Sequence, residues 1–141
     1  MMANKQELIQ GLNEDLAAEW GTIIRYTYQA ANSFGIVGSE LRAILEREVQ
    51  DEIGHAAFLT DVIVDLGGEP TTTPDTFDKP KDIKQMLQFD LEMEKQDVEN
   101  YKKHARMAED LGEIELKVKL EEIAADEDRH AREIRRLLKG L

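Results

Sequence analysis

The chain has 141 residues, a length typical of one domain, so we expect a single domain over residues 1–141. It contains no cysteine, which excludes disulfides, thiol nucleophiles and cysteine-ligated metal or iron–sulfur sites. Any metal must therefore be bound by His, Asp and Glu. The net charge of −12 argues against nucleic acid as a partner.

The N-terminal residues and the longest apolar runs bear on localisation. The first ten residues, MMANKQELIQ, lack the apolar stretch of a signal peptide. No apolar run approaches the roughly 20 residues of a membrane span. We therefore expect a cytoplasmic protein with no membrane partner.

Helix-breaking residues gather at three places: around Gly35 and Gly38, across residues 67–80, which contain all three prolines, and at Gly112. The intervening segments are rich in helix-forming residues and span 4–33, 38–66, 81–111 and 113–139. The first and last connections are short, so they should join antiparallel neighbours, whereas the middle one can run the length of a bundle. The sequence thus predicts an all-α four-helix bundle with a long crossover between the second and third helices.

Each segment carries a seam of residues spaced alternately by three and four, the spacing that turns one helix face into a bundle core. The seams are Leu12, Leu16, Glu19, Ile23, Tyr26, Ala30; Leu41, Leu45, Glu48, Glu52, His55, Leu59, Val62, Leu66; Leu87, Leu91, Glu94, Val98, Tyr101, Ala105, Ala108; and Leu116, Leu120, Ile123, Glu127, His130, Ile134, Leu137. An acid interrupts every seam near its middle. An uncompensated buried carboxylate costs several kcal/mol, and the seams contain no Lys or Arg at these levels. Divalent cations are the remaining counter-charges.

Two of the interrupting acids belong to Glu-x-x-His motifs, Glu52 with His55 and Glu127 with His130. Residues three apart share a helix face, so each Glu and His can bind one ion. One such motif in a chain this rich in glutamate is weak support. Two motifs in phase with their seams favour a metal site.

The acids also repeat along the chain. Glu19 precedes Glu52 by 33 positions, and Glu94 precedes Glu127 by 33. Glu19 and Glu94, like the two motifs, are 75 positions apart. This repeat predicts two helix hairpins that contribute equivalent ligands about a pseudo-two-fold axis.

The ligand set contains four carboxylates and two imidazoles, whose charge two divalent cations would balance. Such ligands suit iron or manganese and also accept zinc. One Glu from each of two helices, with Glu-x-x-His from each of the other two, is the di-iron carboxylate pattern of helix bundles. The expected metal ligands are Glu19, Glu52, His55, Glu94, Glu127 and His130.

On these residues the sequence resembles the ferritin-like superfamily, most closely bacterioferritin, across nearly the whole chain. The resemblance implies two iron ions per subunit. It makes Glu19 and Glu94 terminal ligands, Glu52 and Glu127 bridging ligands, and Tyr26 the catalytic tyrosine beside the centre.

Other positions relate to the family less directly. Glu48 and Asp51 resemble acids that guide iron in or out, although both could be solvated helix acids.

Bacterioferritin takes its haem ligand from a Met directly after the second-helix Glu; Ile53 stands there, so we expect no haem. The sequence ends 11 residues past His130, too soon for the short fifth helix of ferritin cages. We expect a homo-oligomer but leave open a 24-subunit cage, a 12-subunit shell, a dimer or an open assembly.

Two functions follow from the resemblance. The favoured one is a ferroxidase that oxidises Fe²⁺ to Fe³⁺ with O₂ or H₂O₂, for iron storage or detoxification. The alternative is a peroxide reductase similar to rubrerythrin, a family with an extra carboxylate one turn after the third-helix ligand. Asp97 stands three residues after Glu94, but beside the seam, and the lack of cysteine would require a separate electron donor.

A substrate oxygenase fits a chain of this length less well, since no insertion suggests a substrate pocket. A structural bundle whose acids have no function is disfavoured by the two in-phase motifs and the 75-position repeat. His104 lies outside the seam and has no Glu three positions before it, so we expect a surface histidine.

Overall fold

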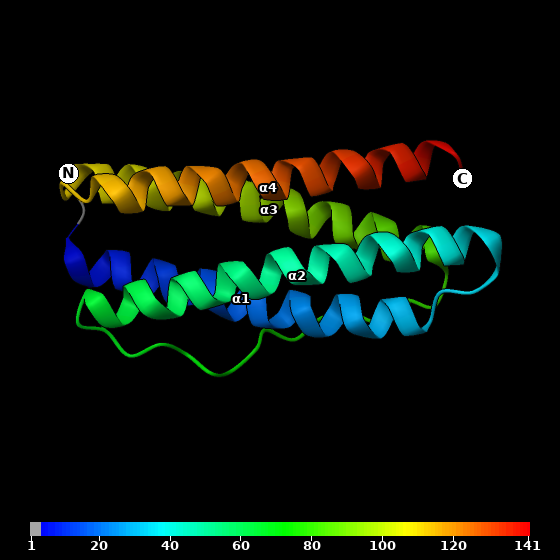
Figure 1. The fold of residues 1–141 in the computed structure, drawn as a ribbon, viewed down its shortest axis with the longest axis horizontal. Helices are drawn as coiled ribbons and strands as arrows, with labels where there is room; N and C mark the ends of the chain where they lie inside the picture. Colours follow the sequence, from blue (N-terminus) through cyan, green and yellow to red (C-terminus); the bar gives the residue numbers. More distant parts are fainter. Residues whose placement is uncertain (1–3) are drawn as a thin grey trace.

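A computed structural model describes residues 4–141 as four α helices (Figure 1). The helices are α1 (Lys5–Ala31), α2 (Gly35–Asp65), α3 (Ile83–Asp110) and α4 (Ile114–Lys139). α1 packs chiefly against α2, and α3 against α4, so the bundle consists of the two expected hairpins. The long connection runs along the outside of the bundle from the end of α2 to the start of α3 (Figure 1). The predicted four-helix bundle with a crossover is confirmed. Within the described residues, no helix has the length and apolarity needed to cross a membrane.

Contacts with α1 hold the crossover in place. The backbone N–H of Asp75 donates to the carbonyl oxygen of Ala17 at 3.0 Å, and the indole N–H of Trp20 donates to the Thr71 carbonyl at 3.0 Å. A Cβ on Gly21 would lie 2.8 Å from the Asp75 carbonyl oxygen, so glycine allows the crossover to approach α1 closely. The crossover is therefore part of the packed structure.

The predicted helix boundaries are close to those observed, with one informative exception. α2 begins at Gly35 and not at position 38. Gly35 adopts φ +77°, the left-handed conformation that glycine permits, and thereby makes the turn. Gly38 lies inside the helix, where a Cβ would be 2.6 Å from the Ser33 carbonyl carbon. Gly38 thus allows close packing and does not break the helix.

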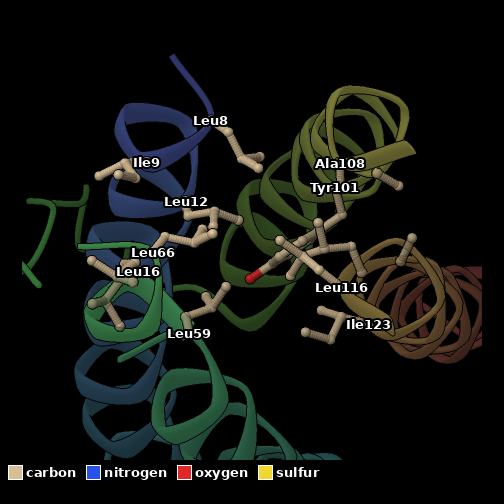
Figure 2. Packing of buried hydrophobic residues seen from close by; sticks show 14 of the residues in the cluster. Leu8, Ile9, Leu12, Leu16, Leu59, Leu66, Tyr101, Ala108, Leu116 and Ile123 are labelled. Carbon is tan, nitrogen blue, oxygen red and sulfur yellow. The ribbon is translucent and has the colours of Figure 1, made fainter. Parts of the chain in front are cut away.

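Two apolar clusters form the core, one toward each end of the bundle. Figure 2 shows the larger cluster, in which Leu8, Leu12, Leu59 and Leu116 point inward from the helices. The smaller cluster contains Tyr26, Ala30, Leu41, Leu45, Leu87 and Ile134. Most seam positions are buried as predicted; the half-buried exceptions are Ile23, Val62, Leu91, Val98 and Leu137.

A buried polar stripe between α1 and α3 was not predicted by the seams. It comprises Asp15, Arg25 and Gln29 on α1, and Asp90, Asp97 and His104 on α3. Arg25 Nε donates to Asp90 Oδ1 at 3.0 Å, and Gln29 Nε2 donates to the same oxygen at 2.9 Å. His104 Nδ1 and Asp15 Oδ2 are 2.6 Å apart.

This stripe corrects one expectation and adds two buried residues that lie outside the seams. The prediction that His104 is a surface histidine is wrong, because its residue exposure is 4%. Asp97 was placed beside the seam, yet only 5% of it is exposed, so it belongs to the interior. The interior also contains Arg25, a basic residue that the seam pattern omitted. The physical reason is that each helix packs against two neighbours, so residues adjacent to the seam are covered as well.

Replacing Arg25 by Ala should destabilise the protein by about 3–5 kcal/mol, because the buried carboxylate of Asp90 would lose its counter-charge and keep only the bond from Gln29. Chemical denaturation of both variants would measure this. The matched control is Arg42→Ala: Arg42 pairs with Glu46 on the surface, and its loss should cost about 1 kcal/mol or less. Equal costs for the two variants would contradict the buried pairing.

Candidate metal centre

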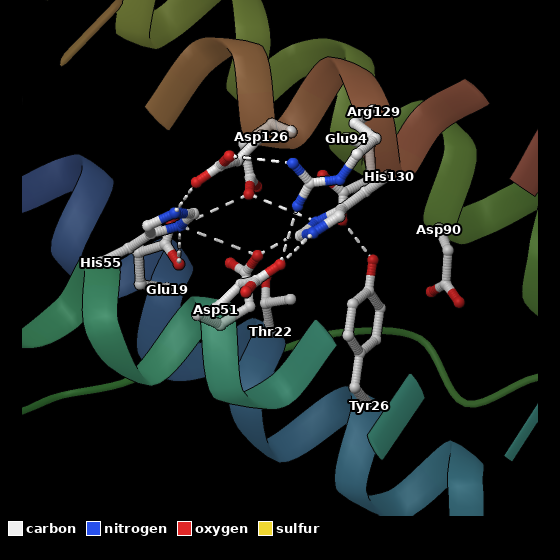
Figure 3. Close-up of polar contacts among 12 residues, drawn as sticks. Glu19, Thr22, Tyr26, Asp51, His55, Asp90, Glu94, Asp126, Arg129 and His130 are labelled. Atoms are coloured by element: carbon white, nitrogen blue, oxygen red, sulfur yellow. Dashed lines mark hydrogen bonds and ion pairs between the residues drawn. The ribbon is translucent and has the colours of Figure 1, made fainter. Parts of the chain in front are cut away.

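The six predicted ligands converge in the interior of the bundle, where Figure 3 shows Glu19, His55, Glu94 and His130 facing one another. All are buried, and they form two groups in which one ligand atom per residue lies within 4.8 Å of the others. One group is Glu19, Glu52, His55 and Glu127; the other is Glu52, Glu94, Glu127 and His130. The two glutamates common to both groups stand where bridging ligands would be needed.

The histidine nitrogens face the shared carboxylates. Glu127 Oε1 lies 3.5 Å from Nδ1 of both His55 and His130. Glu52 Oε1 lies 3.3 Å from His130 Nδ1 and 3.8 Å from His55 Nδ1. Each of the two carboxylates is therefore within reach of both imidazoles.

The residues fit a pair of cations, because their ligand atoms have no other partner. Buried atoms without a hydrogen bond include both oxygens of Glu52 and Glu127, one oxygen each of Glu19 and Glu94, and Nδ1 of both histidines. Buried polar groups are normally paired, so a cluster of unpaired acceptors calls for a missing positive charge. Carboxylate and imidazole ligands of this kind suit iron, manganese or zinc.

The outer nitrogens of the two histidines are fixed by aspartates. His55 Nε2 is 2.9 Å from Asp126 Oδ2, and His130 Nε2 is 2.9 Å from Asp51 Oδ2 (Figure 3). Arg129 bonds to both aspartates, at 3.0 Å to Asp51 and 3.2 Å to Asp126. A proton held on Nε2 by the carboxylate leaves the Nδ1 lone pair free to bind an ion.

Tyrosines bond to the two carboxylates that belong to one ligand group each, Glu19 and Glu94. Tyr101 donates to Glu19 Oε1 at 2.6 Å, and the Tyr26 hydroxyl donates to Glu94 Oε1. Tyr26 therefore lies beside the ligand cluster, where the sequence placed it. Tyr101 was treated as a core residue, although it stands 75 positions after Tyr26, as Asp126 does after Asp51. Applying the 75-position repeat to Tyr26 and Asp51, as well as to the ligands, would have identified Tyr101 and Asp126.

Two buried acids, Glu48 and Asp97, have no acidic counterpart in the 75-position repeat. Glu48 is buried and neither of its carboxylate oxygens has a hydrogen-bond partner, whereas Ile123 occupies the position 75 residues later. Burial raises the pKa of Glu48 to about 9. Asp97 is the second such acid; Thr22 stands 75 positions before it. The two halves of the centre therefore differ in the ionisable groups around them.

The pKa values of the cluster residues show how strongly the site attracts positive charge. Burial, with the charge of Glu52, raises the pKa of Glu19 and Glu127 well above the usual range. Burial alone would lower the pKa of His55, but the neighbouring Glu19 and Glu52 outweigh it and raise that pKa to about 11. For His130, the neighbouring Glu52 and Glu94 likewise outweigh burial and raise its pKa to about 12. Protons and divalent cations thus compete for the same buried carboxylates and imidazoles.

Asp126→Asn should weaken metal binding by about 10–100-fold, because the amide cannot hold the proton on His55 Nε2 as the carboxylate does. Zinc calorimetry would measure the change. Asp128→Asn, an exposed neighbour on the same helix, is the control and should leave the affinity nearly unchanged. An equal effect of both substitutions would mean that Asp126 does not position the ligand.

The class of protein follows from this fold and cluster. The family model described as "Ferritin-like domain" matches residues 9–141, so the chain belongs to the ferritin-like family. It has a ferritin-like di-iron-carboxylate fold with a buried cluster of carboxylates and histidines.

Solved structures give more particular similarities. The chain is 42% identical to a ferritin-like di-iron-carboxylate protein from Bacillus anthracis, with a TM-score of 0.94 over 98% of this chain and 99% of that one. Bacterioferritin from Desulfovibrio desulfuricans is 25% identical, with a TM-score of 0.88 over 96% and 80%. Bacterioferritin BfrA from Mycobacterium tuberculosis is 26% identical, with a TM-score of 0.88 over 99% and 87%. Among curated proteins, none matches this sequence.

Proposed function

We propose that this protein is a ferroxidase, which binds two Fe²⁺ ions per subunit as substrate and oxidises them to Fe³⁺ with O₂ or H₂O₂, for iron storage or detoxification. The observation that carries this proposal is the pair of buried ligand groups sharing Glu52 and Glu127. Two ions held by shared carboxylates can deliver two electrons to one oxidant. The ligands also allow manganese or zinc to substitute.

We assign the remaining ligands and Tyr26 by their contacts. Glu19 and His55 would complete one ion's ligands, and Glu94 and His130 the other's. The Tyr26 hydroxyl donates to Glu94 Oε1, so it can hold a proton beside the reacting ions. This contact supports the catalytic role expected for Tyr26.

Glu48 and Asp51 suit a path for iron at the His130 side. The unpaired carboxylate of Glu48 is buried, and the partly exposed Asp51 bonds to His130. Together they extend the acidic ligands toward the surface between α2 and α4. The position of Glu48 favours the guiding role over that of a solvated helix acid.

A rubrerythrin-like peroxide reductase is the second candidate, and the burial of Asp97 favours it. Burial and the charge of Glu94 raise the pKa of Asp97 well above its usual range. However, Asp97 belongs to neither ligand group. We therefore keep the ferroxidase as the first candidate, with Asp97 as the residue that distinguishes the two.

Purified protein loaded anaerobically with Fe²⁺ should bind two ions per chain, as measured by metal analysis after gel filtration. Glu127→Ala should lose tight binding of the second ion, because the substitution removes a ligand common to both groups. Glu121→Ala, an exposed acid on the same helix, should still bind two. Wild-type protein that saturates at one ion or none would overturn the proposal.

We propose a homo-oligomer as the working assembly. Haem is not part of the proposed function, because the exposed Ile53 side chain has no atom that could ligate iron.

A further inference from the structure

A hollow lies outside the metal centre, between the N-terminal half of α1 and the C-terminal half of α3. It measures about 410 Å³, and its lining includes the acids Glu7, Glu14 and Asp110 together with Lys103. Acids alone do not define a site, since exposed carboxylates are common in this chain. The residue that distinguishes this hollow is His104, which also lines it.

His104 is buried but has one nitrogen without a partner. Its Nδ1 is 2.6 Å from the buried Asp15 Oδ2, and 95% of its side chain is covered. Within residues 4–141, no hydrogen bond or ion pair reaches its Nε2. A Cβ on Gly11 would lie 2.5 Å from that Nε2, so the missing side chain of Gly11 leaves room for the nitrogen at the hollow.

The bond to Asp15 prepares this nitrogen to bind a cation. A carboxylate that holds the proton on one imidazole nitrogen leaves the lone pair of the other available. His55 is held by Asp126 in the same manner, but with its nitrogens exchanged. The function proposed above gives no role to the pair of Asp15 and His104.

Charged side chains flank the nitrogen on both sides. Glu7 precedes Gly11 by four residues and Glu14 follows it by three, so both share its face of α1. Neither belongs to a ligand group with His104, but both side chains are exposed. Glu7 Oε1 accepts a hydrogen bond from Asn4 Nδ2 at 3.1 Å, so Glu7 would have to exchange this surface bond for the ion. Glu14 has no ion pair among the described residues, which leaves its carboxylate available. Lys103 is the one basic residue in the lining.

We propose that His104 Nε2, with Glu14 and Glu7, binds a third divalent transition-metal ion at a mononuclear site between α1 and α3. One imidazole with carboxylates suits Fe²⁺, Mn²⁺ or Zn²⁺. The buried acids Asp15 and Asp97 continue along the same helix interface toward the dinuclear centre. The site would hold Fe²⁺ on its way to that centre, a role that rests on the proposed ferroxidase function.

Zinc is the probe for this site. In solution, calorimetry of the intact protein should show three zinc ions per chain, two tight and one weaker. Crystals grown with zinc should show an anomalous peak about 2.1 Å from His104 Nε2. Glu14→Gln should weaken only the third ion, by about tenfold, and His104→Gln should abolish it. Glu40 is a comparable exposed acid at the opposite end of the bundle, and Glu40→Gln should leave the affinity for all three zinc ions unchanged.

The inference is overturned by saturation at two ions, by the absence of zinc at His104, or by equal effects of Glu14→Gln and Glu40→Gln. If His104→Gln fails to fold, two measurements still test the inference: the position of zinc in crystals of the wild-type protein, and the affinity of Glu14→Gln for the third ion. Zinc at the dinuclear centre but not at His104 would contradict this inference alone. Zinc at His104 but not at the dinuclear centre would support it and contradict the proposed function.

Discussion

Removing metal with EDTA should lower the melting temperature of the protein by about 15–25 °C relative to the fully loaded form. Two ions, each present at about 100 times its dissociation constant, together stabilise the folded state by about 5 kcal/mol. In a domain of this size each kcal/mol corresponds to about 3–5 °C. The binding energy contributes to folding because the unfolded chain does not assemble the six ligands. Differential scanning calorimetry with and without metal would measure the shift.

Glu127→Gln provides the matched control for this experiment. The amide preserves the volume of a carboxylate that lies in both ligand groups, but removes its charge. Metal should then raise the melting temperature of the variant much less. In EDTA the variant should be at least as stable as wild type, because one buried acid fewer must be kept protonated or paired. Wild-type protein insensitive to EDTA would contradict the metal centre.

The ligands could be predicted from sequence because they obey two independent regularities. Glu52 and Glu127 continue an apolar seam and also form the first residue of a Glu-x-x-His motif. The 75-position repeat then relates Glu19 to Glu94. The structure brings all of them together in the bundle interior.

The polar stripe could not be predicted in the same way. A seam reports one face of each helix, whereas Arg25 and His104 lie on faces covered only by the α1–α3 contact. Which residue faces Arg25 depends on how the two hairpins are placed relative to each other. That placement is tertiary information that the spacing within a helix does not contain. The burial of Asp97, which lies beside the seam, could not be predicted for the same reason.

Fe²⁺ added well beyond two ions per subunit should continue to be oxidised, and the iron should remain soluble with the protein. A ferroxidase must release Fe³⁺ to turn over, and the unpaired buried carboxylate of Glu48 provides a place for it to go. Glu48→Gln should leave the first two oxidations intact but slow later turnover by about tenfold. Glu46→Gln, exposed on the same helix, is the control. Stopped-flow absorbance followed by iron analysis of the soluble protein separates the two phases.

A rubrerythrin-like peroxidase would behave differently, because its two irons stay bound and cycle between oxidation states. Oxidation would then stop near two irons per subunit unless a reductant were supplied. Asp97→Ala would slow peroxide consumption under reductant, since Asp97 would act as a seventh ligand one turn after Glu94. Under the ferroxidase proposal, Asp97→Ala should leave the first oxidation nearly unchanged, because Asp97 belongs to neither ligand group. Arrest at two irons together with rapid, Asp97-dependent peroxide turnover would reverse the choice between the two functions.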